Sequence, residues 1–309
     1  MNEGALTQAQ EDFSDLERSL RRPRSLFSWL MSVLTGAMTF AALVPLFSVL
    51  YLLITRGGKQ LGLATFRELP PAALMPGGGF GNAIVGTIVM VGIAAVISVP
   101  FGILAAIFIA EFGPDSRTAD AVRFCAKVLT GLPSILAGVF AYAAVVVLTG
   151  GFSAPAGGVA LAILMLPTVL LTAEEAIKRV PPKMREAAIG MGATPAQVVL
   201  RVVLPTAMPG VATGVMLAVA RAAGETAPLL FTALFSDYWI SRSAPVFLPK
   251  TMGDLMKPTA SLAVLIYNFS GSPFDNQIEL AWAAALVLVV LVLVVNLAGQ
   301  IVARRSGQH

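Results

Sequence analysis

Cysteine, histidine and charged residues are scarce in this sequence of 309 residues. The one cysteine, Cys125, cannot form a disulfide within the chain, and the one histidine is the last residue, His309. A zinc site built on His and Cys, and a hydrolase of the HExxH type, are therefore excluded. The sequence also has no G-x-x-x-x-G-K loop and no G-x-S-x-G elbow. We therefore expect no catalytic residues, and no ATP hydrolysis by this chain alone.

The shortage of charge is matched by an excess of apolar residues. Only 12% of the residues are charged while 57% are hydrophobic, and the mean hydropathy is +0.82. A soluble protein of this length carries about twice that charged fraction. The composition predicts an integral membrane protein in contact with lipid. In such a protein a net charge of +4 is no sign of nucleic-acid binding, because the location of the basic residues matters more than their sum.

Apolar runs long enough to cross a bilayer, about 20 residues each, predict an all-α protein with six transmembrane helices. Residues 1–25 are polar and form an N-terminal arm, and residues 26–305 form the membrane domain. The segment Thr259–Phe269 is apolar but too short to span, so we expect an interfacial or re-entrant piece. The expected spans are Phe27–Ile54, Phe80–Ala110, Phe124–Leu148, Gly157–Ile177, Met208–Phe235 and Ile278–Val302.

The distribution of Lys and Arg predicts the orientation. With the N-terminus inside, fourteen basic residues lie in cytoplasmic segments and six in outer loops, and Arg221 lies within a span. Basic residues concentrate in cytoplasmic loops. Both termini, the arm and the loop at about 181–205 are therefore expected in the cytoplasm.

That loop is a charged insert of small residues between two apolar runs. Pro181 and Pro182 begin it and Pro205 ends it, which predicts backbone breaks at both ends. We expect one short helix from about Pro182 to Ile189 and a glycine turn after it. A second helix should begin at Thr194, which has the pattern of an N-cap followed by Pro195. Two such helices are too short and too charged to cross lipid, so they lie at the membrane surface.

The loop resembles the EAA loop of the permease subunits of bacterial ABC importers. The matching positions are Glu186, Ala187, Ala188, Gly192, Leu204 and Pro205, and Val202 replaces the usual isoleucine. The resemblance implies the six-helix type I (MetI-like) permease fold, with this loop docking on a cytoplasmic ATPase. Small alanines would allow close approach to that partner. The alternative is a surface turn between membrane helices.

The fifth expected span contains two charges, Arg221 and Glu225, four residues apart and so expected on one helix face. Gly214 and Ala218 lie on the same side, which makes this face small and polar. A charge at mid-membrane costs about 2.5–3.5 kcal/mol or more, so it is kept when paired or functional. One interpretation is an ion pair that locks the helix bundle. The other is a path for an anion, since Arg presents a planar fork of donors that fits an oxyanion.

The surrounding sequence, RAAGETAPLL, resembles the PstA-type permease subunits of bacterial phosphate ABC importers. Gly131-Leu132-Pro133-Ser134 is similar to a G-x-P-S motif of phosphate permeases. The resemblance covers residues 27–302 and implies that Arg221 and Glu225 serve phosphate passage, with Thr226 and Ser134 beside the path. For the second motif, a proline kink whose freed carbonyl is satisfied by Ser134 is the alternative.

The resemblance further implies partners: a homologous companion permease, two copies of a cytoplasmic ATPase and an external phosphate-binding protein. ATP and Mg would be bound by the ATPase, and this chain would hold no cofactor. The expected function is phosphate translocation across the inner membrane by alternating access. Other oxyanions (sulfate, molybdate, phosphonate), a gradient-driven carrier, and a regulatory scaffold are the alternatives.

Overall fold

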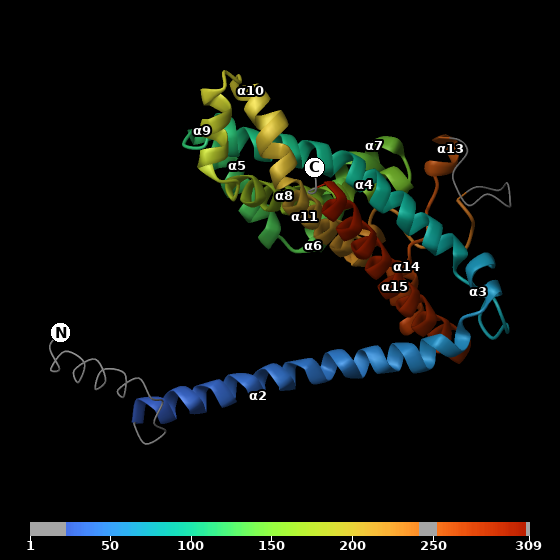
Figure 1. The fold of residues 1–309 in the computed structure, drawn as a ribbon. Coiled ribbons are helices and arrows are strands. Elements are labelled where there is room, and N and C mark those ends of the chain that lie inside the picture. Colours follow the sequence, from blue (N-terminus) through green and yellow to red (C-terminus); the bar gives the residue numbers. More distant parts are fainter. Residues whose placement is uncertain (1–22, 241–251, 307–309) are drawn as a thin grey trace. The chain divides into compact units, whose positions relative to one another are not determined.

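A computed structural model describes residues 23–240 and 252–306 of the chain, and these residues are helical with connecting loops. Residues 1–54 and 55–309 form two separate compact units. The first contains α2, which begins at Pro23 and ends at Leu52. The expected polar arm lies almost entirely outside the described residues. The second unit contains the remaining helices, with α9 (Pro182–Gly190) and α10 (Pro195–Val198) at one end and α3 (Leu63–Arg67) at the other (Figure 1).

Five described helices are long and apolar enough to cross a membrane, or six if one bent pair is counted as a span. Each of the long α-helices overlaps one of the expected spans. They are α2, α4 (Gly81–Ile107), α8 (Ala154–Lys178), α11 (Leu204–Gly224) and α15 (Asp275–Ser306). The all-helical, multi-span prediction is thus confirmed. The smaller elements are η1 (Leu53–Gly57), η2 (Gly58–Gln60), η3 (Phe108–Phe112), η4 (Tyr142–Val146), α7 (Val147–Thr149) and α13 (Met252–Leu255).

The third expected span, Phe124–Leu148, is wrong as a single straight helix. The structure has α5 (Arg117–Gly131) and a second helical stretch that begins with α6 (Ser134–Ala141), bent by 105° at the break. Pro133 explains the break, because a proline disfavours helical geometry in the residue before it. Leu132 is accordingly extended, with φ −71° and ψ 138°.

The fifth expected span, Met208–Phe235, also has the wrong bounds. The helix begins earlier, since α10 (Pro195–Val198) and η5 (Val199–Val203) lead directly into α11, and it ends at Gly224. A short helix, α12 (Ala227–Leu230), follows the break. Pro228 has no N–H for the carbonyl of Gly224, and proline is well accommodated in the first turn of a new helix. The chain therefore breaks the span at Glu225 and Thr226.

The apolar segment after residue 258 forms α14 (Leu262–Ser270), nine residues long and too short to span, as expected. Ser261 caps it by accepting a hydrogen bond from the N–H of Val264 (3.3 Å). Its first four residues are buried, and it packs against α15 and α4. The helix is therefore built into the bundle at the end where α4 and α15 begin.

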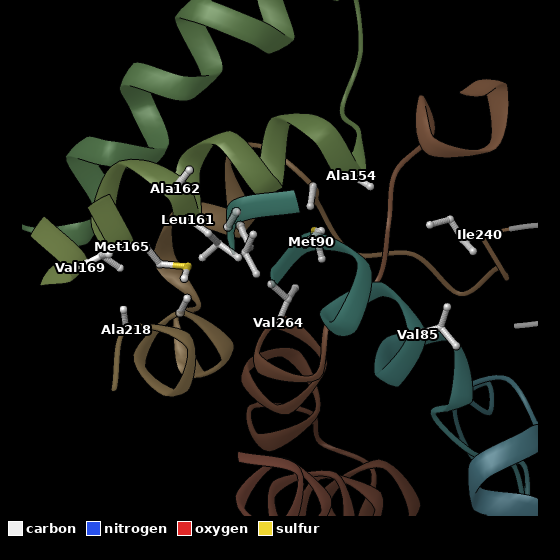
Figure 2. Packing of buried hydrophobic residues seen from close by; sticks show 14 residues of the cluster. Val85, Met90, Ala154, Leu161, Ala162, Met165, Val169, Ala218, Ile240 and Val264 are labelled. Atoms are coloured by element: carbon white, nitrogen blue, oxygen red, sulfur yellow. The ribbon is translucent and has the colours of Figure 1, made fainter. Parts of the chain in front are cut away.

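The main core lies between α4, α8 and α11. Met90 from α4, Leu161 and Met165 from α8, and Ala218 from α11 converge there (Figure 2). The approach of α11 to α8 depends on glycine: a Cβ atom at Gly214 would lie 2.1 Å from Oγ1 of Thr172. The small residues of α11 thus pack on α8 of the same chain.

Candidate functional site: a broken membrane helix and a surface loop

The expected surface loop is formed as the sequence predicts. Helix α9 (Pro182–Gly190) is followed by a turn at Gly192, whose φ of +86° lies in the left-handed region that favours glycine. The N–H of Gly192 donates to the carbonyl of Ile189 (2.8 Å), and that of Ala193 donates to Ala188 (3.1 Å). These two bonds form a Schellman motif. The turn therefore fixes where the chain leaves α9.

The second helix of the loop, α10, begins at a capping box. The side chain of Thr194 accepts from the N–H of Gln197, and the side chain of Gln197 accepts from the N–H of Thr194. Because α10 and η5 run directly into α11, the loop is joined through continuous helix to the span that contains Arg221.

The motif residues of the loop divide into two groups. Ala188 is 3% exposed and belongs to a cluster with Val198, Val203 and Ala207 of its own chain. Its small size therefore serves internal packing, which corrects the expectation that it makes room for a partner. Glu186, Ala187, Gly192 and Pro205 are exposed, and Leu204 is half-buried.

Several apolar side chains on the loop are exposed and were missed in the sequence, and two of them flank Gly190. Ile189 is 59% exposed and Met191 is 83% exposed, on either side of Gly190 at the end of α9. Apolar residues in an otherwise polar, surface-lying segment are the signal that could have indicated them. Together with Ala187 they give this end of the molecule an apolar contact surface.

The membrane charges lie at the helix break rather than within a helix. Arg221 is in the last turn of α11, while Glu225 follows the last helical residue and is extended (φ −74°, ψ 125°). The expectation that both lie on one helix is therefore wrong for Glu225. The pair still forms, with 3.5 Å between Nε of Arg221 and Oε1 of Glu225. The Arg221 side chain is 44% exposed and that of Glu225 is 16% exposed.

The register of α11 against α8 gives the depth of Arg221. Cβ atoms at Gly210 and Gly214 would meet Ala176 and Thr172, so the two helices run antiparallel. Seven residues beyond Gly214, about 10 Å along the helix, Arg221 is level with the middle of α8, which spans Ala154–Lys178. An incompletely covered arginine thus lies level with the middle of an apolar helix that is long enough to cross a membrane.

The two sequence motifs expected beside the path, residues 131–134 and 221–230, lie on neighbouring segments in the structure. A Cβ atom on Gly138 of α6 would lie 2.7 Å from Cα of Pro228, so α6 packs directly on α12. Ser134 is half-buried and one turn before Gly138, on the same face of α6. Thr226, also half-buried, precedes α12, and its carbonyl accepts from the N–H groups of Leu229 and Leu230. Two hydroxyls and the ion pair therefore belong to packed neighbouring segments.

A second charged cluster lies at the end of the bundle from which the loop extends. The sequence did not indicate its role. Arg123 of α5 donates to Glu174 of α8 (2.7 Å), and Lys178 pairs with the same carboxylate (2.6 Å). Arg123 also donates to the carbonyl of Ile109 (2.8 Å). This ties α5 to both α8 and the end of α4.

Comparison with known proteins places this chain in a family. Residues 98–308 match the sequence model of the "Binding-protein-dependent transport system inner membrane component" family. The chain belongs to this family, and it is a multi-pass transport component and not an enzyme.

Particular relatives are also similar along most of their length. The phosphate transport system permease protein PstA of Yersinia pestis is 38% identical over 270 residues, which cover 87% of this chain and 88% of that protein. PstA 1 of Mycobacterium tuberculosis is 35% identical, with 84% and 82% covered.

Two solved structures share the fold. The bacterial alginate ABC transporter in complex with its alginate-bound periplasmic protein has a chain with TM-score 0.61 and 17% identity, covering 94% of this chain and 99% of that chain. An inward-facing MetNI methionine ABC transporter has a chain with TM-score 0.52 and 23% identity, covering 73% and 93%. The MetI-like permease fold expected from the sequence is thereby confirmed.

Proposed function

We propose that this chain is a permease subunit of an ATP-driven importer that moves inorganic phosphate across the inner membrane by alternating access. The names of the curated relatives support phosphate as cargo. The single observation that carries the proposal is Arg221, level with the middle of α8 and 44% exposed beside the break that follows α11.

The exposure of Arg221 argues for a second subunit. A charged side chain facing lipid at mid-membrane costs about 2.5–3.5 kcal/mol or more, and the described residues of the unit 55–309 leave nearly half of Arg221 uncovered. A homologous companion permease that covers this face, with an aqueous path between the two subunits, removes that cost. Arg221 and Glu225 then border the path.

The chemistry of the break fits phosphate. The planar donors of Arg221 match an oxyanion. Glu225 accepts hydrogen bonds, so it favours an anion that still carries a proton, as phosphate does at neutral pH and sulfate does not. The hydroxyls of Thr226 and Ser134 add donors on the neighbouring segments. Sulfate, molybdate and phosphonate remain the alternative cargoes.

The loop supplies the coupling. Glu186, Ala187, Ile189 and Met191 form the exposed surface that docks on a cytoplasmic ATPase, with the turn at Gly192 holding its shape. Two ATPase copies bind ATP and Mg, one per permease subunit, and this chain binds no cofactor. Both termini lie in the cytoplasm, and a phosphate-binding protein delivers cargo on the other side.

Uptake by the reconstituted system tests the proposal. Proteoliposomes that contain this chain, the companion permease and the ATPase, with the binding protein outside, should take up labelled phosphate only when ATP is supplied. Excess sulfate or molybdate should leave the rate unchanged. Uptake that persists without the ATPase, or that sulfate blocks as well as unlabelled phosphate does, would contradict it.

A further inference from the structure

Arg185, in α9, contacts two other helical elements, η3 and α8, and the turn that follows α8. Its Nη2 donates to Oε1 of Glu111 at 2.7 Å, and its Nε lies 3.2 and 3.3 Å from the two oxygens of the same carboxylate. Nη1 donates to the carbonyl of Val180 (2.6 Å), and Nη2 also donates to that of Ile177 (3.0 Å). The side chain of Arg185 is 22% exposed and that of Glu111 is 12% exposed, so both are largely enclosed.

Each of these acceptors lies at the end of a membrane helix. Glu111 is in η3, which continues α4, and Ile177 and Val180 are in the last turn of α8 and just after it. The last carbonyls of a helix have no partner within the helix and carry partial negative charge. A guanidinium, with five donors in a fixed fork, can satisfy several of them and a carboxylate together. Lysine, a point charge, cannot reproduce this geometry.

The location of this contact matters because the backbone joins α9 directly to two of the membrane helices but not to α4. It is connected by the backbone to α8 before it and, through α10 and η5, to α11 after it. Helix α4 precedes α9 by more than seventy residues in the sequence, yet it packs closely on α8. The Arg185–Glu111 pair gives α9 a charge-assisted link to α4.

The segment that contains Glu111 is also held by Arg123 of α5. The carbonyl of Ile109, two residues before Glu111, accepts from Arg123, which in turn pairs with Glu174 of α8. Element η3, which continues α4 and contains Glu111, is therefore fixed by hydrogen bonds from α5 and from α9. A displacement of α9 would thus move α4 together with α8.

We propose that Arg185 is a positioning residue for energy coupling, and that its pair with Glu111 transmits movement of α9 to α4. The inference rests on the proposed function of the loop as the ATPase docking element. In this view the ATPase moves α9, and three spans respond: α11 and α8 through the backbone, and α4 through Arg185.

The test uses the complete reconstituted importer and three measurements: ATPase subunits bound per permease, ATP hydrolysis, and phosphate transported per ATP hydrolysed. Arg185→Gln removes the charge and most of the donors. We expect normal ATPase binding but about a tenfold fall in phosphate per ATP. Arg185→Lys should recover only part of it, because the fork is lost. The matched control is Arg179→Gln, which removes an exposed Arg–Glu pair at the same end of the bundle (77% and 62% exposed) and should leave the ratio unchanged.

Glu111→Gln is the second variant, in case Arg185→Gln does not assemble. It preserves volume and leaves both carbonyl contacts of Arg185 in place, so it should assemble and lower phosphate per ATP by a smaller factor, about threefold. The inference is overturned by a normal ratio in both variants, by an equal fall in Arg179→Gln, or by variants that lose assembly while the assembled remainder couples normally. Failure of the proposed function itself would be seen separately, because the unmodified complex would then bind no ATPase or take up no phosphate.

Discussion

Gly138 in α6 and Pro228 in α12 are in backbone contact, although ninety residues separate them in the sequence. A Cβ atom on Gly138 would lie 2.7 Å from Cα and 3.1 Å from the carbonyl oxygen of Pro228. Pro228 and the following Leu229 are buried, and Leu229 in turn contacts the position of Gly157 on α8. The break beside Arg221 is therefore anchored by close helix contacts, so its geometry depends on a glycine in another span.

The first prediction tests that contact with one substitution at two glycines. Gly138→Ala should destabilise the assembled protein by about 1–3 kcal/mol through overpacking and reduce phosphate uptake. Gly131→Ala should not, because nothing lies within 4 Å of a Cβ there. Thermal denaturation in detergent and uptake would be measured for both. Equal stability of the two variants would show that α6 does not need this close approach.

The second prediction concerns the ion pair. If Arg221 and Glu225 serve anion passage, Arg221→Gln should abolish uptake and leave assembly intact, while Glu225→Gln should impair uptake less than Glu225→Lys. If the pair only locks the bundle, each single change would leave an uncompensated charge and reduce assembly. The double change Arg221→Gln with Glu225→Gln would then restore both. A double variant that assembles and transports normally would rule out the anion path.

The surface loop and the two helix breaks show which features could be predicted from the sequence. The loop could be predicted in detail, down to the cap at Thr194 and the turn at Gly192, because capping and turn signals act over a few neighbouring residues. The breaks at Leu132 and Glu225 were not predicted, although Pro133 and Pro228 are visible. A proline in a membrane helix is compatible with a kink or a full break, and packing between α6 and α12 decides between them.

The side of α9 on which each motif residue lies was likewise beyond the sequence. The pattern placed Ala187 and Ala188 together as small contact residues, but only the packing of α9 on Val198 and Val203 shows that Ala188 is internal. The link between Glu111 and Arg185 was also missed. It joins residues seventy-four positions apart, and the charge of each could equally have been solvated.

The third prediction uses the backbone at Gly192. Its φ of +86° is unfavourable for alanine, so Gly192→Ala should destabilise the loop by about 1–2 kcal/mol and lower phosphate transported per ATP. Gly190→Ala, two residues away in helical backbone with open space around it, should be neutral or stabilising by up to about 1 kcal/mol. Limited proteolysis of the loop and the coupling ratio would be compared. A Gly192→Ala protein that matches Gly190→Ala in both would show that the turn is not needed.

The fourth prediction concerns orientation. Single cysteines at Lys183 in α9 and at Leu74 in the loop before α4, with Cys125 replaced by serine, should differ in intact cells. Both side chains are exposed in the structure, so accessibility depends on the side of the membrane. An impermeant thiol reagent should label the cysteine at residue 74, and should label that at residue 183 only after the cells are opened. Labelling at 183 from outside would reverse the proposed topology.

The last prediction separates folding from docking at adjacent alanines. Ala188 is 3% exposed within the cluster that holds α9 against the bundle, so Ala188→Glu would place a carboxylate in an apolar site. Burial of an uncompensated polar group costs several kcal/mol, and the protein should fail to accumulate in the membrane.

Ala187 is exposed on the same helix, so Ala187→Glu should fold and accumulate normally but bind the ATPase weakly, because the added carboxylate obstructs a close contact. Membrane levels by immunoblot and co-purified ATPase distinguish the two effects. Loss of accumulation in both variants would mean that the exposed face of α9 is also structural. Normal ATPase binding by the Ala187 variant would mean that the partner contacts α9 elsewhere, leaving Ile189 and Met191 as the surface to change next.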